Sequence, residues 1–427
     1  MTTTTNNEQK KLNFSSEREQ SQACLNSAEH EKNQGRKVLN VPNLRFPEFQ
    51  GEWEKCTLED VINFSTTRVN SSELNKDNYV STENMLQDYQ GIVKAKSVPE
   101  DVNVVSFSCG DVLISNIRPY LKKVWKATFN GGCSSDVFVL KANDNIESDY
   151  LHYVIANDKF INFVMSGTKG VKMPRGDKKQ METYSLSLPQ IQEQHKIARL
   201  LSLLDERIAT QNKIIDKLQS LIKGLNDSLY AQYGGKVLTS FAELGTSYSG
   251  LSGKSAQDFG SGKPFITYLN VYSNNAINEN DFQYVAIKDG EKQNIVEYGD
   301  VLFTLSSETP EEVGIGSVYL GKEKVYLNSF CFGIHITNTE VAFPPYLSYY
   351  VSSPAFRKFI YPYAQGSTRF NLCKADFEKA SIKLPTLENQ KRIYSILSHI
   401  DSKIETERQM LDLYNSQKQY LLRQMFI

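Results

Sequence analysis

Paired cysteines are missing from this sequence. Its six cysteines are scattered, with no Cys-x-x-Cys pair and no histidine at zinc-ligand spacing: Cys24, Cys56, Cys109, Cys133, Cys331 and Cys373. Such a distribution is typical of reduced thiols in a cytoplasmic protein and argues against a disulfide framework or a zinc site. We therefore expect a cytoplasmic protein without a bound metal.

A long apolar run is also absent, since no stretch approaches the about 18 residues that span a bilayer. The N-terminus is rich in Thr, Asn, Gln and Glu and lacks the apolar core of a secretory signal. We expect no contact with a membrane. Residues 1–38 have few branched or aromatic side chains to bury, which predicts a disordered N-terminal extension.

The chain lacks an excess of either charge. It has 48 Lys and Arg against 49 Asp and Glu, a formal net charge of −1, so it has no global attraction for nucleic acid. Any nucleic-acid binding must use local basic patches. A chain of 427 residues predicts two or three domains. Its 23 Tyr and 22 Phe suit β-structure and aromatic contact surfaces.

The sequence contains a long internal repeat. The segment from Ser187 to Ile197 (SLPQIQEQHKI) returns from Lys383 to Ile393 (KLPTLENQKRI), at a constant offset of 196 residues (189 to 385, 194 to 390, 205 to 401). Weaker parallels lie upstream at varying offsets: Gly110-Asp111-Val112-Leu113 with Gly299-Asp300-Val301-Leu302, Tyr79–Met85 with Phe265–Val271, and Ser166–Lys169 with Gln365–Arg369. A repeat this long indicates two domains, each followed by a linker, rather than a solenoid of short repeats.

Each copy ends in an apolar heptad pattern. The first seam comprises Ile197, Leu201, Leu204, Ile208, Ile215, Leu218, Ile222, Leu225 and Leu229, interrupted by Gln211. The second comprises Ile393, Leu397, Ile400, Ile404, Leu411, Tyr414, Leu421 and Met425, interrupted by Glu407 and Lys418. Steps of four and three residues predict two long helices, which pair most simply with each other as an antiparallel coiled coil. A coiled coil between two copies of the chain is the alternative.

Upstream of each long helix we expect a strand-rich region followed by amphipathic helices. The expected strands are Val102–Phe107, Asp111–Ile117 and Val137–Leu140 in the first copy, and Val301–Leu305, Ser317–Leu320 and Phe330–Ile336 in the second. The expected helices lie around Tyr150–Val164 and Tyr346–Ile360. The predicted fold class is therefore α+β: two mixed α/β domains separated by two long helices that form an antiparallel intramolecular coiled coil, with a pseudo-two-fold internal repeat.

Two segments carry a family resemblance. Val41-Pro42-Asn43-Leu44-Arg45-Phe46-Pro47-Glu48-Phe49, followed by Glu52-Trp53, resembles the opening of staphylococcal type I restriction-modification specificity subunits. The Leu-Pro-x-[Ile/Leu]-x-[Glu/Asn]-Gln start of both long helices resembles the two conserved regions of that family. The resemblance covers residues 39–427 and implies target-recognition domain 1 at 39–187, a central spacer helix at 188–233, target-recognition domain 2 at 234–383 and a C-terminal spacer helix at 384–427.

The resemblance implies a non-catalytic DNA-binding subunit that reads an asymmetric bipartite target. It implies double-stranded DNA, methyltransferase (modification) subunits and restriction/translocase subunits as partners. S-adenosylmethionine, ATP and Mg would belong to those partner subunits, with no cofactor and no catalytic residue in this chain. Two reading heads on one duplex need a spacing near one helical turn, about 34 Å, which a coiled coil can set.

DNA contacts are expected from basic, polar and aromatic loops, because Lys and Arg neutralise phosphates and forked side chains read base edges. In the first copy the candidates are Arg118, Tyr120, Lys122, Lys123, Lys169, Lys172, Arg175, Lys178 and Lys179. In the second copy they are Ser367, Thr368, Arg369, Asn371 and Lys374. Arg175, Arg369 and Asn371 are the candidates for base contacts. Arg357 and Lys358, on an amphipathic helix, are weaker candidates, and solvated loops are the alternative for every one of these residues.

Two near-matches to catalytic motifs fail. Phe343-Pro344-Pro345-Tyr346 has Phe where an amino-methyltransferase needs Asp or Asn to bind the target amine. Gly250-Leu251-Ser252-Gly253-Lys254-Ser255 lacks the first glycine of a phosphate-binding loop, and we expect a flexible loop over the DNA instead. The alternatives to a specificity subunit are a coiled-coil scaffold holding two protein-binding domains, and an enzyme with an embedded nuclease or methyltransferase site.

Overall fold

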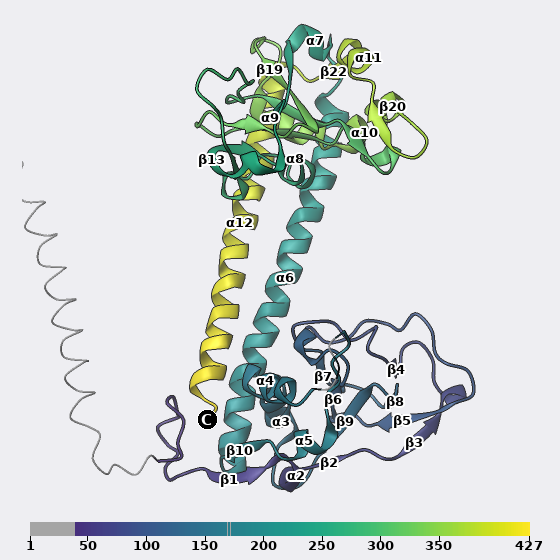
Figure 1. The fold of residues 1–427 in the computed structure, drawn as a ribbon, viewed down its shortest axis with the longest axis vertical. Coiled ribbons are helices and arrows are strands. Elements are labelled where there is room, and N and C mark those ends of the chain that lie inside the picture. The colour runs from purple at the N-terminus through teal and green to yellow at the C-terminus, as the bar shows by residue number, and fades with distance from the viewer. Residues whose placement is uncertain (1–38, 169, 171) are drawn as a thin grey trace, which may run out of the picture. The chain divides into compact units, whose positions relative to one another are not determined.

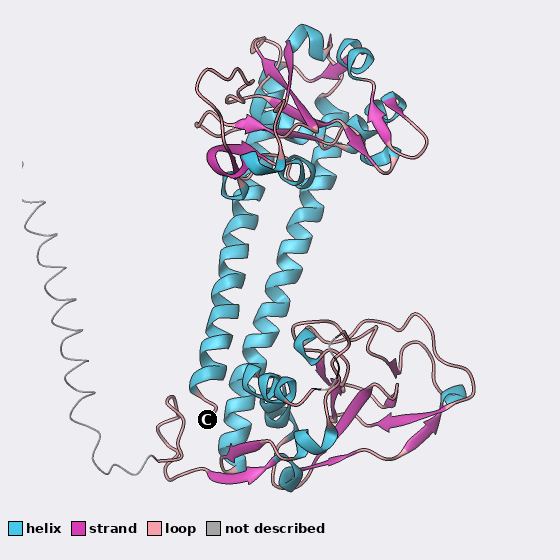
Figure 2. Cartoon of the chain, in the orientation of Figure 1, coloured by secondary structure: helices cyan, strands magenta, loops and turns pink. Residues whose placement is uncertain are grey.

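A computed structural model describes residues 39–168, 170 and 172–427. The predicted disordered extension, residues 1–38, lies outside the described residues. The described chain forms two compact units. Unit 1 contains the described residues up to Arg207 together with Tyr414–Ile427, and unit 2 contains Ile208–Leu413. Both units mix helices and strands, as Figures 1 and 2 show.

The two long helices, α6 (Ile191–Tyr233) and α12 (Leu387–Gln424), each contribute to both units. Their seam residues turn inward: Ile197, Leu201 and Leu204 are buried in unit 1, and Ile393, Leu397 and Ile404 in unit 2. In unit 1, Lys418 of α12 forms an ion pair with Asp205 of α6. In unit 2, the amide of Gln211 donates to the carbonyl of Glu407 at 3.0 Å and to its carboxylate.

These contacts show that the helices run antiparallel within one chain, which confirms the predicted intramolecular coiled coil (Figure 1). Gln211 and Glu407 are the two polar interruptions of the seams, and they occupy equivalent positions of the repeat (211 + 196 = 407). A polar pair within an apolar seam favours one register over its alternatives.

Each unit is built on its own four-stranded antiparallel sheet, and the two sheets have corresponding strand orders. In unit 1 its order is β2 (Ile62–Phe64), β9 (Val137–Ala142), β6 (Val112–Ser115), β7 (Val124–Lys126). In unit 2 the corresponding order is β12 (Gly245–Ser249), β19 (Cys331–Ile336), β15 (Val301–Thr304), β17 (Gly316–Val318). The predicted strands Asp111–Ile117 and Val301–Leu305 correspond to β6 and β15, whose side chains are buried on both faces of the sheet.

A second sheet accompanies each framework. In unit 1 it has the order β3 (Arg68–Asn70), β5 (Asn103–Phe107), β8 (Gly131–Cys133), β4 (Tyr79–Val80), and in unit 2 the order β14 (Gln283–Val285), β13 (Phe259–Ile266), β18 (Tyr326–Leu327). Unit 2 has a further small sheet, β16 (Ser306–Ser307), β21 (Phe370–Leu372), β20 (Ala364–Gln365). Antiparallel pairs close both units: β1 (Glu54–Thr57) with β10 (Ser185–Leu188), and β11 (Val237–Thr239) with β22 (Ile382–Leu384).

Short helices connect the sheets to the long helices. In unit 1 they are α2 (Leu58–Val61), α3 (Ser148–Ile155), α4 (Asp158–Ser166) and α5 (Lys178–Glu182). In unit 2 they are α7 (Phe241–Leu244), α8 (Tyr268–Ser273), α9 (Pro344–Val351), α10 (Pro354–Ile360) and α11 (Lys374–Lys379). The core of unit 2 joins sheet, short helices and long helix through rings such as Phe303, Phe332 and Phe377, which pack with Ile393 and Leu397.

The repeated Leu-Pro motif ends in a glutamine that fixes the start of each long helix. Gln194 is fully buried; its side-chain amide donates to the carbonyls of Pro189 and Asn145, and its oxygen accepts from the backbone of Glu147. Gln390 makes the same three bonds, to Pro385, Val341 and Phe343. Each glutamine therefore ties its long helix to the loop before the short helix of the same unit.

Candidate nucleic-acid interface

In unit 1 the structure brings two of the predicted basic loops together. Ile117 and Arg175 form an antiparallel β-bridge, and the backbone of Arg118 donates to the carbonyl of Pro174 at 2.8 Å. Arg118 and Lys122 flank the short 3-10 turn Pro119–Leu121, and both have left-handed backbones, with φ of +50° and +53°. Such conformations cost of order 1 kcal/mol each in residues other than glycine, and they are common at functional sites.

Several candidate cations of unit 1 already have partners within the unit. The ammonium of Lys122 lies 2.8 Å from Asp158, and that of Lys123 donates to the carbonyl of Thr82 at 2.6 Å. Partial burial lowers the pKa of Lys123, and the charge of Arg118 lowers it further. These two ammonium groups are therefore engaged within the unit, which makes them weaker candidates for a phosphate contact than exposed lysines without a partner.

The other described candidates of unit 1 point outward. Arg118, Lys172 and Lys179 are exposed and make no ion pair among the described residues. Tyr120 is exposed beside them. Arg175 is also exposed, although its guanidinium lies 3.1 Å from Asp136, a surface ion pair that contributes little to stability. Lys169 lies outside the described residues.

In unit 2 the candidates surround the β20–β21 hairpin. Ser367, Thr368 and Arg369 form its exposed tip. The Arg369 guanidinium donates to the hydroxyl of Ser306 at 3.3 Å and lies 5.9 Å from the Phe330 ring centre. Gly366 has φ of +144°, and a Cβ there would lie 2.1 Å from the carbonyl oxygen of Arg369, so the tight tip requires glycine.

Beside this tip lies a groove that no motif in the sequence predicts. Its cavity is about 760 Å³, and Thr368 and Arg369 line it together with aromatic and aliphatic side chains from other loops: Tyr268, Leu269, Tyr272 and Phe330. Leu269 and Phe330 are largely exposed. A signal for Leu269 was present in the sequence. Leu269 falls in the segment parallel to Tyr79–Met85, at the position where unit 1 has Glu83.

The repeat separates framework residues from variable ones. Lys178 and Lys374 are 196 residues apart, each begins a short helix, and each pairs with a glutamate four residues later, at 3.8 Å and 3.6 Å. Each also lies over a phenylalanine ring. Two copies of one arrangement indicate that these two candidates stabilise the framework.

Arg175 and Asn371, also 196 residues apart, are the contrasting case. Each pairs through its backbone with a residue just after the central strand of its unit. Arg175 pairs with Ile117, which follows β6, and Asn371 pairs with Ser306, which follows β15. The backbone position is shared and both side chains are exposed, but one is a guanidinium and the other a carboxamide. A different forked side chain at one repeated place is what two reading surfaces of different specificity require.

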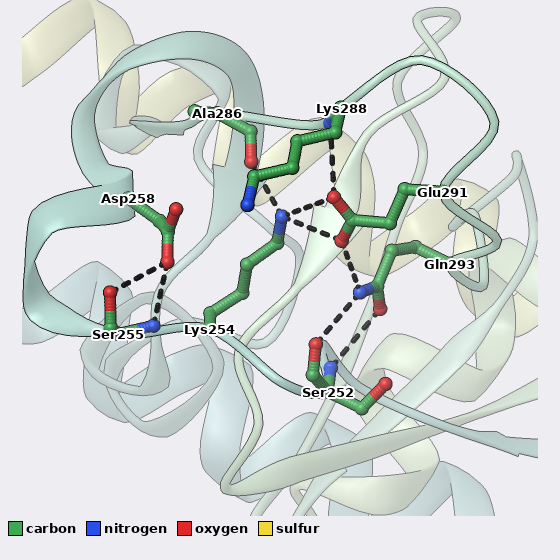
Figure 3. Close-up of polar contacts among 8 residues, drawn as sticks. All are labelled: Ser252, Lys254, Ser255, Asp258, Ala286, Lys288, Glu291 and Gln293. Carbon is green, nitrogen blue, oxygen red and sulfur yellow. Dashed lines mark hydrogen bonds and ion pairs between the residues drawn. The ribbon is translucent and has the colours of Figure 1, made fainter.

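Two expectations need correction. Arg357 is turned inward: its guanidinium donates to the carbonyls of Glu311, Val313 and Gly314, and burial lowers its pKa. The loop around Lys254 is anchored rather than flexible. Figure 3 shows the Lys254 ammonium between the carboxylate of Glu291 and the carbonyl of Ala286, and its side chain is only 6% exposed. Gln293 ties Ser252 into the same network. Neither cation is presented to a phosphate.

Among the described residues, no group of three or more His, Cys, Asp or Glu side chains could hold a metal ion. Within the same part of the chain, every helix is too short or too polar to cross a membrane.

The fold and the two loop surfaces define a class: internally repeated proteins whose two α/β halves present matching frameworks with different exposed side chains. The family profile described as "Type I restriction modification DNA specificity domain" matches residues 50–220 and again residues 245–413. The chain belongs to this family, which confirms the resemblance found in the sequence.

Individual relatives agree with this assignment. The putative type I restriction enzyme MjaX specificity subunit of Methanocaldococcus jannaschii is 26% identical over 415 residues, covering 87% of this chain and 92% of the relative. The type I restriction enzyme EcoDI specificity subunit of Escherichia coli is 28% identical over 126 residues, 30% of this chain and 28% of that relative.

Solved structures share the fold. The crystal structure of a type I restriction-modification S subunit from M. genitalium superposes with a TM-score of 0.55 at 15% identity, covering 91% of this chain and 99% of that one. A chain from a study of complex assembly and conformational transition of the type I R-M system gives a TM-score of 0.56 at 18% identity, covering 87% and 96%.

Proposed function

We propose that this chain is the recognition subunit that reads an asymmetric bipartite DNA target, one half with each unit, and directs adenine methylation or cleavage by partner subunits. The observation that carries the proposal is the pair Arg175 and Asn371, which are different exposed side chains at one repeated backbone position. A shared framework explains why both units bind a duplex, and different loop side chains explain why the two half-sites differ.

The proposal assigns chemistry to other chains. Methyltransferase subunits would supply S-adenosylmethionine, and restriction/translocase subunits would supply ATP and Mg, while this chain binds DNA in the cytoplasm without a cofactor. The candidate residues support this division, because those that are exposed carry cations, amides, hydroxyls and rings. Such groups bind phosphates and base edges.

The test is a methylome. The chain is co-expressed with its presumed methyltransferase partner in a host without background adenine methylation, and methyladenine is mapped by long-read sequencing. We expect one split motif of two unlike short halves around a fixed gap. Absence of new methylation together with absence of a complex would contradict the proposal and favour a coiled-coil scaffold for two protein-binding domains. Such a scaffold also predicts no DNA affinity.

A further inference from the structure

Each unit contains a tyrosine that bonds to an aspartate on a long helix. In unit 1 the hydroxyl of Tyr153 donates to Asp205 at 2.8 Å. In unit 2 the hydroxyl of Tyr349 donates to Asp401. Both tyrosines are buried, and both pairs are related by the offset of 196 residues (153 to 349, 205 to 401). The local framework is therefore the same in the two units.

In unit 1 a lysine completes this arrangement. The ammonium of Lys418 lies 2.6 Å from Asp205 and 5.9 Å from the centre of the Tyr153 ring. The side chain of Lys418 is only 19% exposed. The carboxylate thus accepts a tyrosine hydroxyl and pairs with a cation that also lies over the tyrosine ring.

In unit 2 the lysine has no counterpart. The position equivalent to Lys418 is Ile222 (418 − 196 = 222), whose side chain carries no charge and has no polar group. Among the described residues, Asp401 makes no ion pair within 4 Å, although the more distant charge of Arg408 favours its ionised form. Asp401 is exposed to a groove of about 870 Å³, which Ile222 and Tyr349 also line. The groove occupies the place where unit 1 has its lysine.

We propose that this groove binds a lysine or arginine side chain of a partner protein, held by Asp401 and the Tyr349 ring as Lys418 is held in unit 1. The inference rests on the proposed function, because the partner we assign to it is the methyltransferase subunit.

The lining of the groove fits a protein better than DNA. Glu405 stands one turn beyond Asp401 and adds a second carboxylate, which repels a phosphate backbone. Lys223 and Arg408 lie on the same rim, and Ile222 and Leu320 supply apolar surface. Apolar contacts bordered by charges of both signs are typical of protein–protein interfaces.

The first part of the test asks whether the groove accepts an ammonium group. Ile222→Lys supplies one from within the chain, at the place that Lys418 occupies in unit 1. Ile222 packs against the core of unit 2, so the test is the coupling and not the net stability. We expect Ile222→Lys to be better tolerated in urea titrations when Asp401 is present than in the Asp401→Asn background, as a double-mutant cycle measures. No coupling between the two substitutions would overturn the proposal, whatever the partner does.

The second part measures the dissociation constant of the methyltransferase subunit for the full chain. Asp401→Asn removes the charge and Ile222→Lys fills the groove, so both should weaken binding about tenfold. Asp205→Asn, which breaks the internal pair of unit 1, should leave binding near the wild-type value. Wild-type affinity in Asp401→Asn and Ile222→Lys would overturn the proposal.

A wild-type chain that forms no complex with the methyltransferase subunit would be a failure of the proposed function instead. It would also overturn the assignment of that subunit as occupant, while the double-mutant cycle would still report whether the groove accepts an ammonium group. The two failures therefore give different results.

Discussion

At the scale of single residues, the repeat shows where the two units carry different side chains at equivalent positions. His152 of α3 lies beside the Tyr153–Asp205–Lys418 cluster, and its equivalent in unit 2 is Ser348. Its Nδ1 atom is buried without a hydrogen-bond partner among the described residues. Burial lowers the pKa of His152 to about 4, and the charge of Lys418 acts in the same direction.

His152 should make unit 1 sensitive to acid. The folded state binds this proton less readily than the unfolded state, whose histidine pKa is about 6.5, so stability is complete above that pH. As the pH falls from about 6.5 toward 4, the unfolding free energy should decrease by about 1.4 kcal/mol per pH unit. His152→Ser should remove this dependence, as read by hydrogen exchange of α3 amides. His195→Ser, at an exposed site on α6, should retain it; an unchanged slope in His152→Ser would refute the assignment.

Arg175 and Asn371 should each control one half of the recognised sequence. We expect Arg175→Ala to relax one base position in one half by about 10- to 100-fold and to leave the other half unchanged, because a bidentate base contact discriminates by about 1–3 kcal/mol. Asn371→Ala should do the same in the other half. Binding selections on randomised duplexes measure both effects.

The framework lysines provide the control for this prediction. Lys178→Ala and Lys374→Ala remove a repeated ion pair and ring contact, so they should change stability without changing the preferred bases. Relaxation at both halves in Arg175→Ala would show that the residue acts on the whole chain rather than on one half-site.

At the scale of elements, the long helices were predictable and their anchors were not. The heptad spacing of Ile197, Leu201 and Leu204 indicates a helix whatever the surrounding fold, since it depends only on local periodicity. The role of Gln194 could not be deduced from the sequence, because its partners Asn145 and Glu147 lie in a loop far away along the chain. The repeat showed that the position mattered, but not which groups it contacts.

The same distinction explains the loop residues. The composition of the loops around Arg118 and Arg369 indicated that these loops carry positive charge. It could not show that Lys122 pairs with Asp158, or that Arg357 and Lys254 are turned inward, because those contacts join segments distant in sequence. The sequence therefore predicted which loops carry candidate residues but could not sort their side chains into exposed and paired.

The motif glutamines should be essential to the elements they anchor. Gln194→Ala and Gln390→Ala each leave buried backbone groups without a partner, and we expect each to cost about 2–4 kcal/mol of unfolding free energy. Gln192→Ala, an exposed neighbour on α6, should cost less than about 0.5 kcal/mol. Urea titrations of the three variants measure the difference. Equal effects for Gln192 and Gln194 would mean that the three hydrogen bonds of Gln194 do not stabilise the helix start.

At the scale of the whole molecule, a net charge of −1 means that DNA affinity must come from local groups of exposed cations. Each cation that neutralises a phosphate releases counterions, so it steepens the dependence of log K on log salt by about 0.9. Arg118 and Lys172 should contribute to this slope, whereas Lys122 and Lys374 are already paired with Asp158 and Glu378.

We therefore expect Arg118→Ala and Lys172→Ala each to lower the slope by about 1, measured by fluorescence anisotropy of a duplex between about 50 and 200 mM salt. Lys122→Ala and Lys374→Ala should leave it unchanged, because their ion pairs release no counterions when DNA binds. A slope that fell equally in all four variants would show that the ion pairs open in the complex. In that case the net charge of the free protein would underestimate the positive charge it presents to DNA.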